Sequence, residues 1–163
     1  MTGKELVHAF AGNPLDRGTS IRHSGEKIDA MKELPSARYL VFQDLKVLTS
    51  DGAIDYVAYS SLPKLRGDQM FLGTLNNVPY FAVQTDDADV GEFTDCRQVV
   101  RQKDLSQSGI VAQARSMLAW HRKNPFCSRC GSETALERGG QLRRCPACNA
   151  TTHPRVDPVV IML

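Results

Sequence analysis

Several strand-forming segments, one helical period and a late pair of Cys-x-x-Cys motifs together predict an α+β fold for this chain. We expect an N-terminal domain with an antiparallel sheet and a C-terminal helix, then a small zinc ribbon, then the first strand of a further domain. The expected boundaries are 1–104 for the α+β domain, 105–124 for a linking helix, 125–154 for the ribbon and 155–163 for the next domain.

The first predicted element is a strand meander that begins at Ala37. Residues 38–42 and 46–49 are rich in β-formers, a turn at 50–52 follows, and 54–59 alternates with period two. Residues 1–33 mix Gly, Pro, Asp, Arg and Ser without a sustained period, so extended or poorly specified structure is expected before the meander.

A second hairpin is predicted across Asn76-Asn77, between the strand-like segments 70–73 and 80–83. Pro79 indicates that its second strand begins there or lies at an edge, because proline cannot donate to the ladder. The aromatic residues of these strands are most simply core. The acidic segment 85–89 lacks the spacing of an EF-hand and is interpreted as a solvated loop.

A helix follows, since apolar or small residues recur on one helical face at Ile110, Ala114, Met117, Leu118 and His121. Asp104 and Gln107 are candidates to cap its start. Asn124-Pro125 ends it, because proline disfavours helical geometry in the preceding residue. His121, beside Trp120, has no apparent nucleophile or carboxylate partner, so we expect it to pack against the ribbon rather than act as a base.

The four late cysteines have the spacing of a tetrahedral zinc site: Cys127-x2-Cys130-x14-Cys145-x2-Cys148. Four thiolates leave no coordination position for a catalytic water, so the predicted role of the zinc is structural. Gly139-Gly140 lies between the pairs, where a hairpin must turn.

Two other readings of these cysteines are weaker. Two disulfides are typical of small secreted scaffolds, which a 163-residue chain with five cysteines and no signal peptide does not resemble. A redox Cys-x-x-Cys needs no matching second motif. Cys96 lies far from the group and is interpreted as a buried apolar residue.

Charge and hydropathy narrow the functional classes. No apolar run approaches the ~20 residues of a membrane span, so we expect a cytoplasmic protein with no membrane partner.

Residues 1–119 carry 13 basic and 15 acidic residues, a net −2, whereas residues 120–163 carry 7 and 3, a net +4. Five basic side chains are candidates for phosphate contact, although such an excess is more often a solvated face: Arg129, Arg138, Arg143, Arg144 and Arg155.

The motifs from Ala114 to Pro158 resemble the middle of the NADH pyrophosphatases, a branch of the Nudix hydrolases. The quoted residues are Ala114-x-x-Met117-Leu118-x-Trp120-His121, Phe126-Cys127-x-x-Cys130-Gly131, Gly139-Gly140, Cys145-x-x-Cys148 and His153-Pro154-Arg155-x-Asp157-Pro158. Upstream, 71–73 and 81–83 look like the N-terminal, Nudix-like domain of that family.

The resemblance implies a parent hydrolase, usually a homodimer, that converts NADH or NAD+ to nicotinamide mononucleotide and AMP, with NAD-capped RNA as a further candidate substrate. Its Mg2+ or Mn2+ ions are held by the glutamates of a Nudix box, which this sequence does not contain, so no catalytic residue is expected here. Residues 158–163 look like the first strand of the catalytic domain, cut off by truncation, and the chain alone is expected to be inactive and structural or dimerising.

Carried over residue by residue, the resemblance makes Cys127, Cys130, Cys145 and Cys148 the zinc ligands. His153 becomes a candidate substrate contact, with packing at the domain junction as its alternative. A competing hypothesis is a complete zinc-ribbon module that binds nucleic acid or forms dimers, supported by the basic ribbon. Against it, only Trp120 and Phe126 provide aromatic rings near the basic residues.

Overall fold

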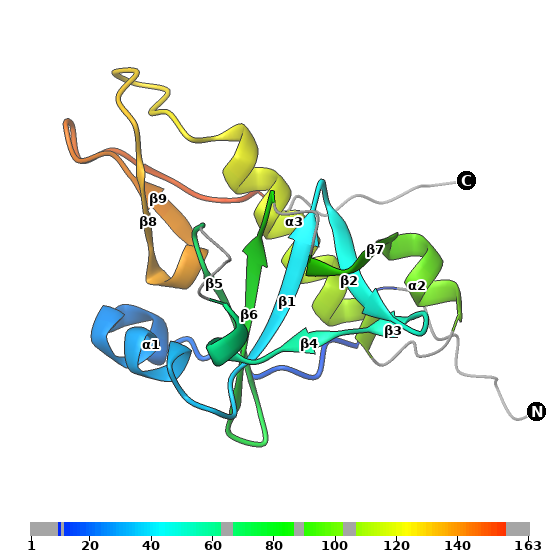
Figure 1. The fold of residues 1–163 in the computed structure, drawn as a ribbon. Coiled ribbons are helices and arrows are strands. Elements are labelled where there is room, and N and C mark those ends of the chain that lie inside the picture. The colour runs from blue at the N-terminus through cyan, green and yellow to red at the C-terminus, as the bar shows by residue number, and fades with distance from the viewer. Residues whose placement is uncertain (1–9, 11, 63–66, 87–89, 103–106, 156–163) are drawn as a thin grey trace, which may run out of the picture.

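The structure is a computed structural model that describes residue 10 and residues 12–62, 67–86, 90–102 and 107–155. A central sheet has helix α3 on one side and helix α1 on the other, and the ribbon stands beyond the end of the sheet (Figure 1). The predicted α+β fold is therefore confirmed. The strand expected at 158–163 lies outside the described residues.

The strands of the main sheet run in the order β3-β2-β1-β6-β5, with β4 also paired to β1 and β7 to β2. Their bounds are β1 Arg38–Gln43, β2 Lys46–Ser50, β3 Ala53–Ile54, β4 Tyr56–Val57, β5 Met70–Leu75, β6 Val78–Gln84 and β7 Glu92–Asp95. Among the described pairings, that of β1 with β6 is the parallel one, so the sheet is mixed rather than antiparallel throughout. Residue alternation fixes which side chains face inward but not strand direction, which explains the difference.

Both predicted hairpin turns are present. Asn76 and Asn77 have φ of 50° and 63°, and Asp51 and Gly52 have φ of 51° and 74°. Two successive positive φ values are typical of type I′ turns, whose twist matches that of the flanking strands. A third such turn joins β1 to β2 through Asp44-Leu45, although leucine is an unusual residue there.

Alternate residues of the sheet contribute to two separate apolar clusters. Leu40 and Phe42 of β1 join the cluster that includes Ile110, Ala114 and Leu118 of α3 (Ser108–Lys123). Their neighbours Tyr39 and Val41 join the opposite cluster, which includes Ile28 of α1. The helical face predicted from Ile110 onward is thus confirmed, and the sheet is covered on both faces.

Helix α1 (Gly25–Lys32) overturns the expectation of unspecified structure before residue 33. It follows a 3-10 turn at Ile21–His23, and the Ser24 side chain caps it by accepting from the Lys27 backbone N–H. Ile28 is its one fully buried residue, so the apolar period is too weak to be read from the sequence.

The remaining helices are a 3-10 turn at Tyr59–Ser61, α2 (Cys96–Gln102) and α3. Gln107 occupies the N-cap of α3 but makes no capping hydrogen bond, because its Oε1 accepts from the Tyr56 hydroxyl at 2.7 Å. The predicted Gln107 cap is therefore wrong, and Asp104 lies outside the described residues. The end of α3 at Asn124 is as predicted.

The ribbon is a three-stranded antiparallel sheet of β8 (Ala135–Glu137), β9 (Leu142–Arg144) and β10 (Thr151–Thr152). A short 3-10 turn at Arg138–Gly140 joins β8 to β9, at the predicted Gly139-Gly140 position.

A buried arginine fastens this turn to the main sheet. Arg22 donates to the carbonyl oxygens of Arg138 and Gly139, both at 3.3 Å, while its other nitrogens donate to Arg17 O at 2.8 Å and Leu72 O at 3.1 Å. The guanidinium also lies 4.8 Å from the centre of the Phe71 ring. Burial, and secondarily the charge of Arg17, lower the pKa of Arg22 to about 10, which leaves it a cation at neutral pH.

Replacing Arg22 with Leu should lower the free energy of unfolding by about 2–4 kcal/mol, because four carbonyl groups lose the guanidinium as a donor. Two of them keep another donor, since Leu72 O also accepts from Gln113 and Arg138 O from the Gln141 backbone N–H. Urea denaturation of the zinc-loaded chain measures the loss. The exposed Arg38, changed to Leu, is the control and should shift stability by less than about 0.5 kcal/mol. Equal effects of the two substitutions would show that Arg22 does not hold the ribbon.

Candidate metal centre

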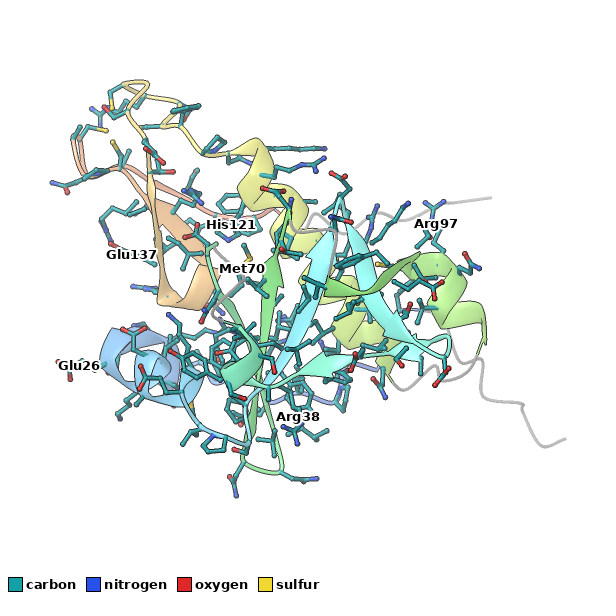
Figure 2. The ribbon with its side chains drawn as sticks, in the orientation of Figure 1. Glu26, Arg38, Met70, Arg97, His121 and Glu137 are labelled. Carbon is teal, nitrogen blue, oxygen red and sulfur yellow. The ribbon has the colours of Figure 1, made fainter. Side chains whose placement is uncertain are left out.

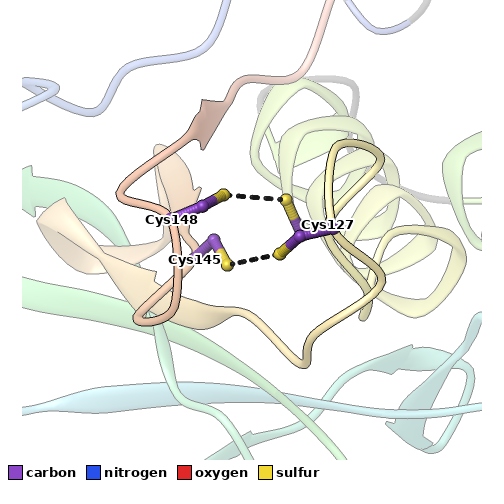
Figure 3. Close-up of side chains that lie close together, drawn as sticks. Cys127, Cys145 and Cys148 are labelled. Atoms are coloured by element: carbon purple, nitrogen blue, oxygen red, sulfur yellow. Dashed lines mark hydrogen bonds between the residues drawn. The ribbon is translucent and has the colours of Figure 1, made fainter.

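Two loops of matching geometry bring the four predicted cysteine ligands together (Figure 3). In the first, Gly131 N donates to Cys127 O and Cys127 N donates to Ser132 O; in the second, Asn149 N donates to Cys145 O and Cys145 N to Ala150 O. These four bonds measure 2.8–2.9 Å. Each loop closes through one residue with positive φ, Gly131 at 77° and Asn149 at 58°. The two Cys-x-x-Cys segments are therefore equivalent halves of one site.

The sulfur atoms have the spacing of a tetrahedral site. Cys130 Sγ lies 3.4 Å from Cys145 Sγ, Cys127 Sγ lies 3.7 Å from Cys148 Sγ, and all four lie within 4.8 Å of one another. A zinc ion about 2.3 Å from each sulfur would set the sulfurs about 3.8 Å apart. All five cysteines are free thiols in the structure, which does not support the two-disulfide reading. The four thiols fit zinc.

The surroundings of these thiols shift their ionisation in different directions. Hydrogen bonds with Ser132 lower the pKa of Cys130 to about 6, and the backbone N–H of Arg129 lowers that of Cys127. Cys148 differs: although the Ala150 backbone N–H lowers it, desolvation and the three neighbouring cysteines raise its pKa to about 12. Four adjacent thiolates repel one another, and a divalent ion at their centre would remove that conflict.

His121 and Arg143 connect this ribbon to helix α3 in a buried network. Arg143 donates to Thr134 Oγ1 and Thr134 O, both at 2.6 Å, and lies 3.2 Å from His121 Nδ1. Arginine can only donate, so Nδ1 accepts, and the neutral ring donates from Nε2 to Gly140 O at 2.8 Å. Burial is the main cause that lowers the pKa of His121, and the charge of Arg143 adds to it. The expected packing role of His121 is confirmed, whereas its pairing with Arg143 had no signal in the sequence.

The five arginines that the sequence offers as phosphate contacts differ in burial and in their partners. Arg143 is buried in the network above, and Arg144 donates to Glu137 Oε1 at 2.8 Å, so both are committed to internal contacts. Arg129, Arg138 and Arg155 are exposed. These internal contacts weaken the phosphate hypothesis for Arg143 and Arg144, and phosphate contact by the other three stays a prediction. Cys96 is buried, with its Sγ 3.4 Å from Leu45 O, as its apolar reading predicts.

His153 does not join the cysteine cluster. It is exposed and lines an open cavity of about 750 Å³ together with Trp120, Gln141 and Pro154. The cavity lies between α3 and the segment that leaves the ribbon. Asp157 lies outside the described residues, so a contact with Arg155 is not described.

Two protein-family models match the chain in succession. The NADH pyrophosphatase-like rudimentary NUDIX domain matches residues 36–120, and the NADH pyrophosphatase zinc ribbon domain matches residues 122–152. This chain belongs to the NADH pyrophosphatase family. The resemblance carried by the cysteine motifs is thereby confirmed, whereas His153-Pro154-Arg155 lies just beyond the residues that the two models match.

Curated relatives of the family include the NAD-capped RNA hydrolase NUDT12 of Homo sapiens, 32% identical over 98% of this chain and 46% of the relative. The NAD-capped RNA hydrolase NudC of Deinococcus radiodurans is 30% identical over 79% of this chain and 46% of the relative. The mitochondrial NAD(P)H pyrophosphatase NUDT13 of Mus musculus is 34% identical over 45% and 21%. The chain spans about half the length, or less, of these relatives. Among its described helices, none has the length and apolarity needed to cross a membrane.

Replacement of Cys127 with Ser should lower zinc affinity by more than about 100-fold, since even outer-shell partners of a metal are worth 10–100-fold. The unchanged chain should hold one zinc per molecule by elemental analysis, and a strong chelator should remove amide-exchange protection from residues 127–148. Cys96→Ala is the control and should keep the zinc. Two internal disulfides without zinc would contradict the site.

His121 should make the stability of the zinc-loaded chain fall as the pH drops below about 6.5. The pKa of His121 is lower in the folded chain than in the unfolded chain. Below about pH 6.5 the unfolded chain therefore binds more protons than the folded chain, and stability keeps falling until the pH reaches the pKa of the folded state. The slope from this residue is at most about 1.4 kcal/mol per pH unit. Glutamine does not titrate, so the His121→Gln variant serves as the reference. Subtracting its urea-denaturation stability from that of the unchanged chain at each pH leaves the contribution of His121 and removes that of the thiols. Parallel pH profiles would contradict the neutral pairing with Arg143.

Proposed function

We propose that this chain is the N-terminal and zinc-ribbon portion of a Nudix NADH pyrophosphatase. The parent enzyme would hydrolyse NADH or NAD+ to nicotinamide mononucleotide and AMP, and would also act on NAD-capped RNA. The observation that carries the proposal is the ordered match of both family models, over residues 36–120 and 122–152. The names of the human and Deinococcus relatives support the RNA substrate.

In this proposal the four cysteines, Cys127, Cys130, Cys145 and Cys148, would hold one structural zinc. A site with four thiolates has no open position for a water, so hydrolysis belongs elsewhere in the parent enzyme. The printed sequence has no Glu-Glu pair and no Arg-Glu-aliphatic run of the kind that a Nudix box contains. The Mg2+ or Mn2+ ions of the parent enzyme would therefore be held by residues outside this chain.

The role that we assign to the chain is to position the catalytic domain. Arg22 and His121 hold the two sides of the Gly139-Gly140 turn, so the ribbon has a fixed orientation on the sheet domain. The chain leaving the ribbon at Pro154 then starts from a fixed point. His153, exposed beside Trp120, is placed to contact the substrate once the catalytic domain is present. A homodimer in the cytoplasm is part of the same proposal.

A complete zinc-ribbon module that binds nucleic acid is the alternative. Its support was the basic ribbon, but the internal contacts of Arg143 and Arg144 leave fewer ribbon cations for phosphate. The family match favours the front part of a diphosphatase over that module.

The zinc-loaded chain of 163 residues should release no AMP from NADH with Mg2+ or Mn2+, because the carboxylates that hold those ions are missing. Chromatography of the nucleotide products measures this. The matched protein is the product of the same reading frame extended beyond Leu163, which should contain a Nudix box and release AMP and nicotinamide mononucleotide. Metal-dependent AMP release by the 163-residue chain would contradict the proposed inactivity, and an extended product without hydrolysis would contradict the proposed function.

A further inference from the structure

Two adjoining hollows lie along the outer side of α3. The larger, about 750 Å³, reaches Trp120 and Arg17, and the smaller, about 490 Å³, reaches Arg97 and Arg115. Three residues line both hollows: Phe10, Ala112 and Ser116. We call this feature the α3 groove.

The α3 groove is basic. Arg17, Arg97 and Arg115 are exposed along it, and Arg155 and His153 lie at its ribbon end. Among its described lining residues Asp95 is the single acid, and Asp95 Oδ1 accepts from the Arg97 backbone N–H at 2.8 Å. The sequence of α3 contains no Asp or Glu. Several cations of one sign in a hollow attract a polyanion.

One hollow on the opposite side of the molecule has the reverse character. This hollow of about 680 Å³ between α1 and the ribbon is lined by four acids, namely Asp29, Glu33, Asp68 and Glu133, with Lys32 and the buried Arg143 as its cations. A second hollow on that side, about 430 Å³, is lined by four basic and two acidic residues but by no Phe, Tyr or Trp. The α3 groove is therefore distinguished by the combination of cations with aromatic rings rather than by cations alone. Figure 2 shows Arg97 on the α2 side of the sheet and Arg38 at a distant end.

Flat aromatic surfaces accompany these cations. Phe10 is 42% exposed and its backbone N–H is held by Ser108 Oγ at 3.1 Å. Trp120 is half-buried, and its ring stands edge-on to His121 with the centres 4.7 Å apart. Exposed aromatic rings beside arginines are typical of surfaces that bind single strands, because every base can stack.

We propose that the α3 groove binds single-stranded RNA, with phosphates at Arg97, Arg115 and Arg17 and bases against Trp120 and Phe10. This inference rests on the proposed function, because an enzyme that acts at a capped 5′ end must accommodate the RNA that follows the cap. The groove favours RNA over an acidic peptide because every nucleotide pairs a phosphate with a base that can stack, whereas only the aromatic residues of a peptide can stack. This proposal differs from the nucleic-acid-binding ribbon module because the RNA would lie on α3 and not on the ribbon.

The intrinsic fluorescence of Trp120, the single tryptophan of the chain, reports directly on the groove. The probe is a 12-nucleotide uridine RNA with a 5′-hydroxyl end and no cap, titrated into the zinc-loaded chain between 50 and 200 mM salt. We expect quenching of the indole and an affinity that falls as salt rises, since phosphate contacts release counterions. The double variant Arg97→Gln/Arg115→Gln should bind about tenfold more weakly and lower the log-log salt slope by about 1.4, or ~0.7 for each contact.

The matched control is Lys27→Gln/Arg38→Gln, which removes two exposed cations from the other side of the molecule. It should change affinity less than about twofold and leave the slope unchanged. Absence of quenching, or equal losses in both double variants, would overturn the inference. A third result would also overturn it: the Arg97→Gln/Arg115→Gln variant keeps its RNA binding but changes its self-association, as measured by sedimentation. The groove would then face a second copy of the chain.

The probe has no diphosphate and requires no hydrolysis, so the two proposals fail separately. Binding of the RNA by a chain whose extended form leaves NADH intact would support the groove and reject the diphosphatase. Hydrolysis of NADH by the extended form with no RNA binding to this chain would reject the groove alone.

Discussion

The Gly139-Gly140 turn is the contact on which the arrangement of the two halves depends. Its consecutive carbonyl oxygens accept from Arg22 and from His121, which belong to opposite sides of the sheet domain. A Cβ on Gly139 would lie 2.9 Å from the Phe71 Cβ, and Gly139 has φ of 60°, so a side chain is excluded both by space and by backbone conformation. The ribbon lies close to the sheet because this turn has no side chains.

The ribbon is thus anchored at both ends by different forces. At the turn, buried hydrogen bonds hold it to the sheet, and breaking one partner would leave polar groups unsatisfied in the interior. At the two Cys-x-x-Cys loops, four sulfur atoms that lie within 4.8 Å of one another are placed to share one cation. A domain this small needs such a staple because its core is minimal.

This anchoring connects the fold to the proposed function. A rigid ribbon fixes both where the chain leaves at Pro154 and where His153 and Trp120 face the cavity. The same helix that supports the ribbon through His121 presents Arg115 and Ser116 on its outer side. Helix α3 therefore joins the two proposals: its inner face builds the core and its outer face lines the basic groove.

The sequence by itself determined the helix from Ile110, the turns at 51–52 and 76–77, and the grouping of four cysteines, because each is encoded by local spacing or by residues with special backbone freedom. Family membership followed from the same local motifs. Tertiary structure alone decided the parallel pairing of β1 with β6, the weakly periodic helix α1, and the partners of Arg22, Gln107 and Arg143. These depend on contacts between residues as many as 117 positions apart, such as Arg22 with Gly139, and no local pattern records which distant carbonyl a buried cation will meet.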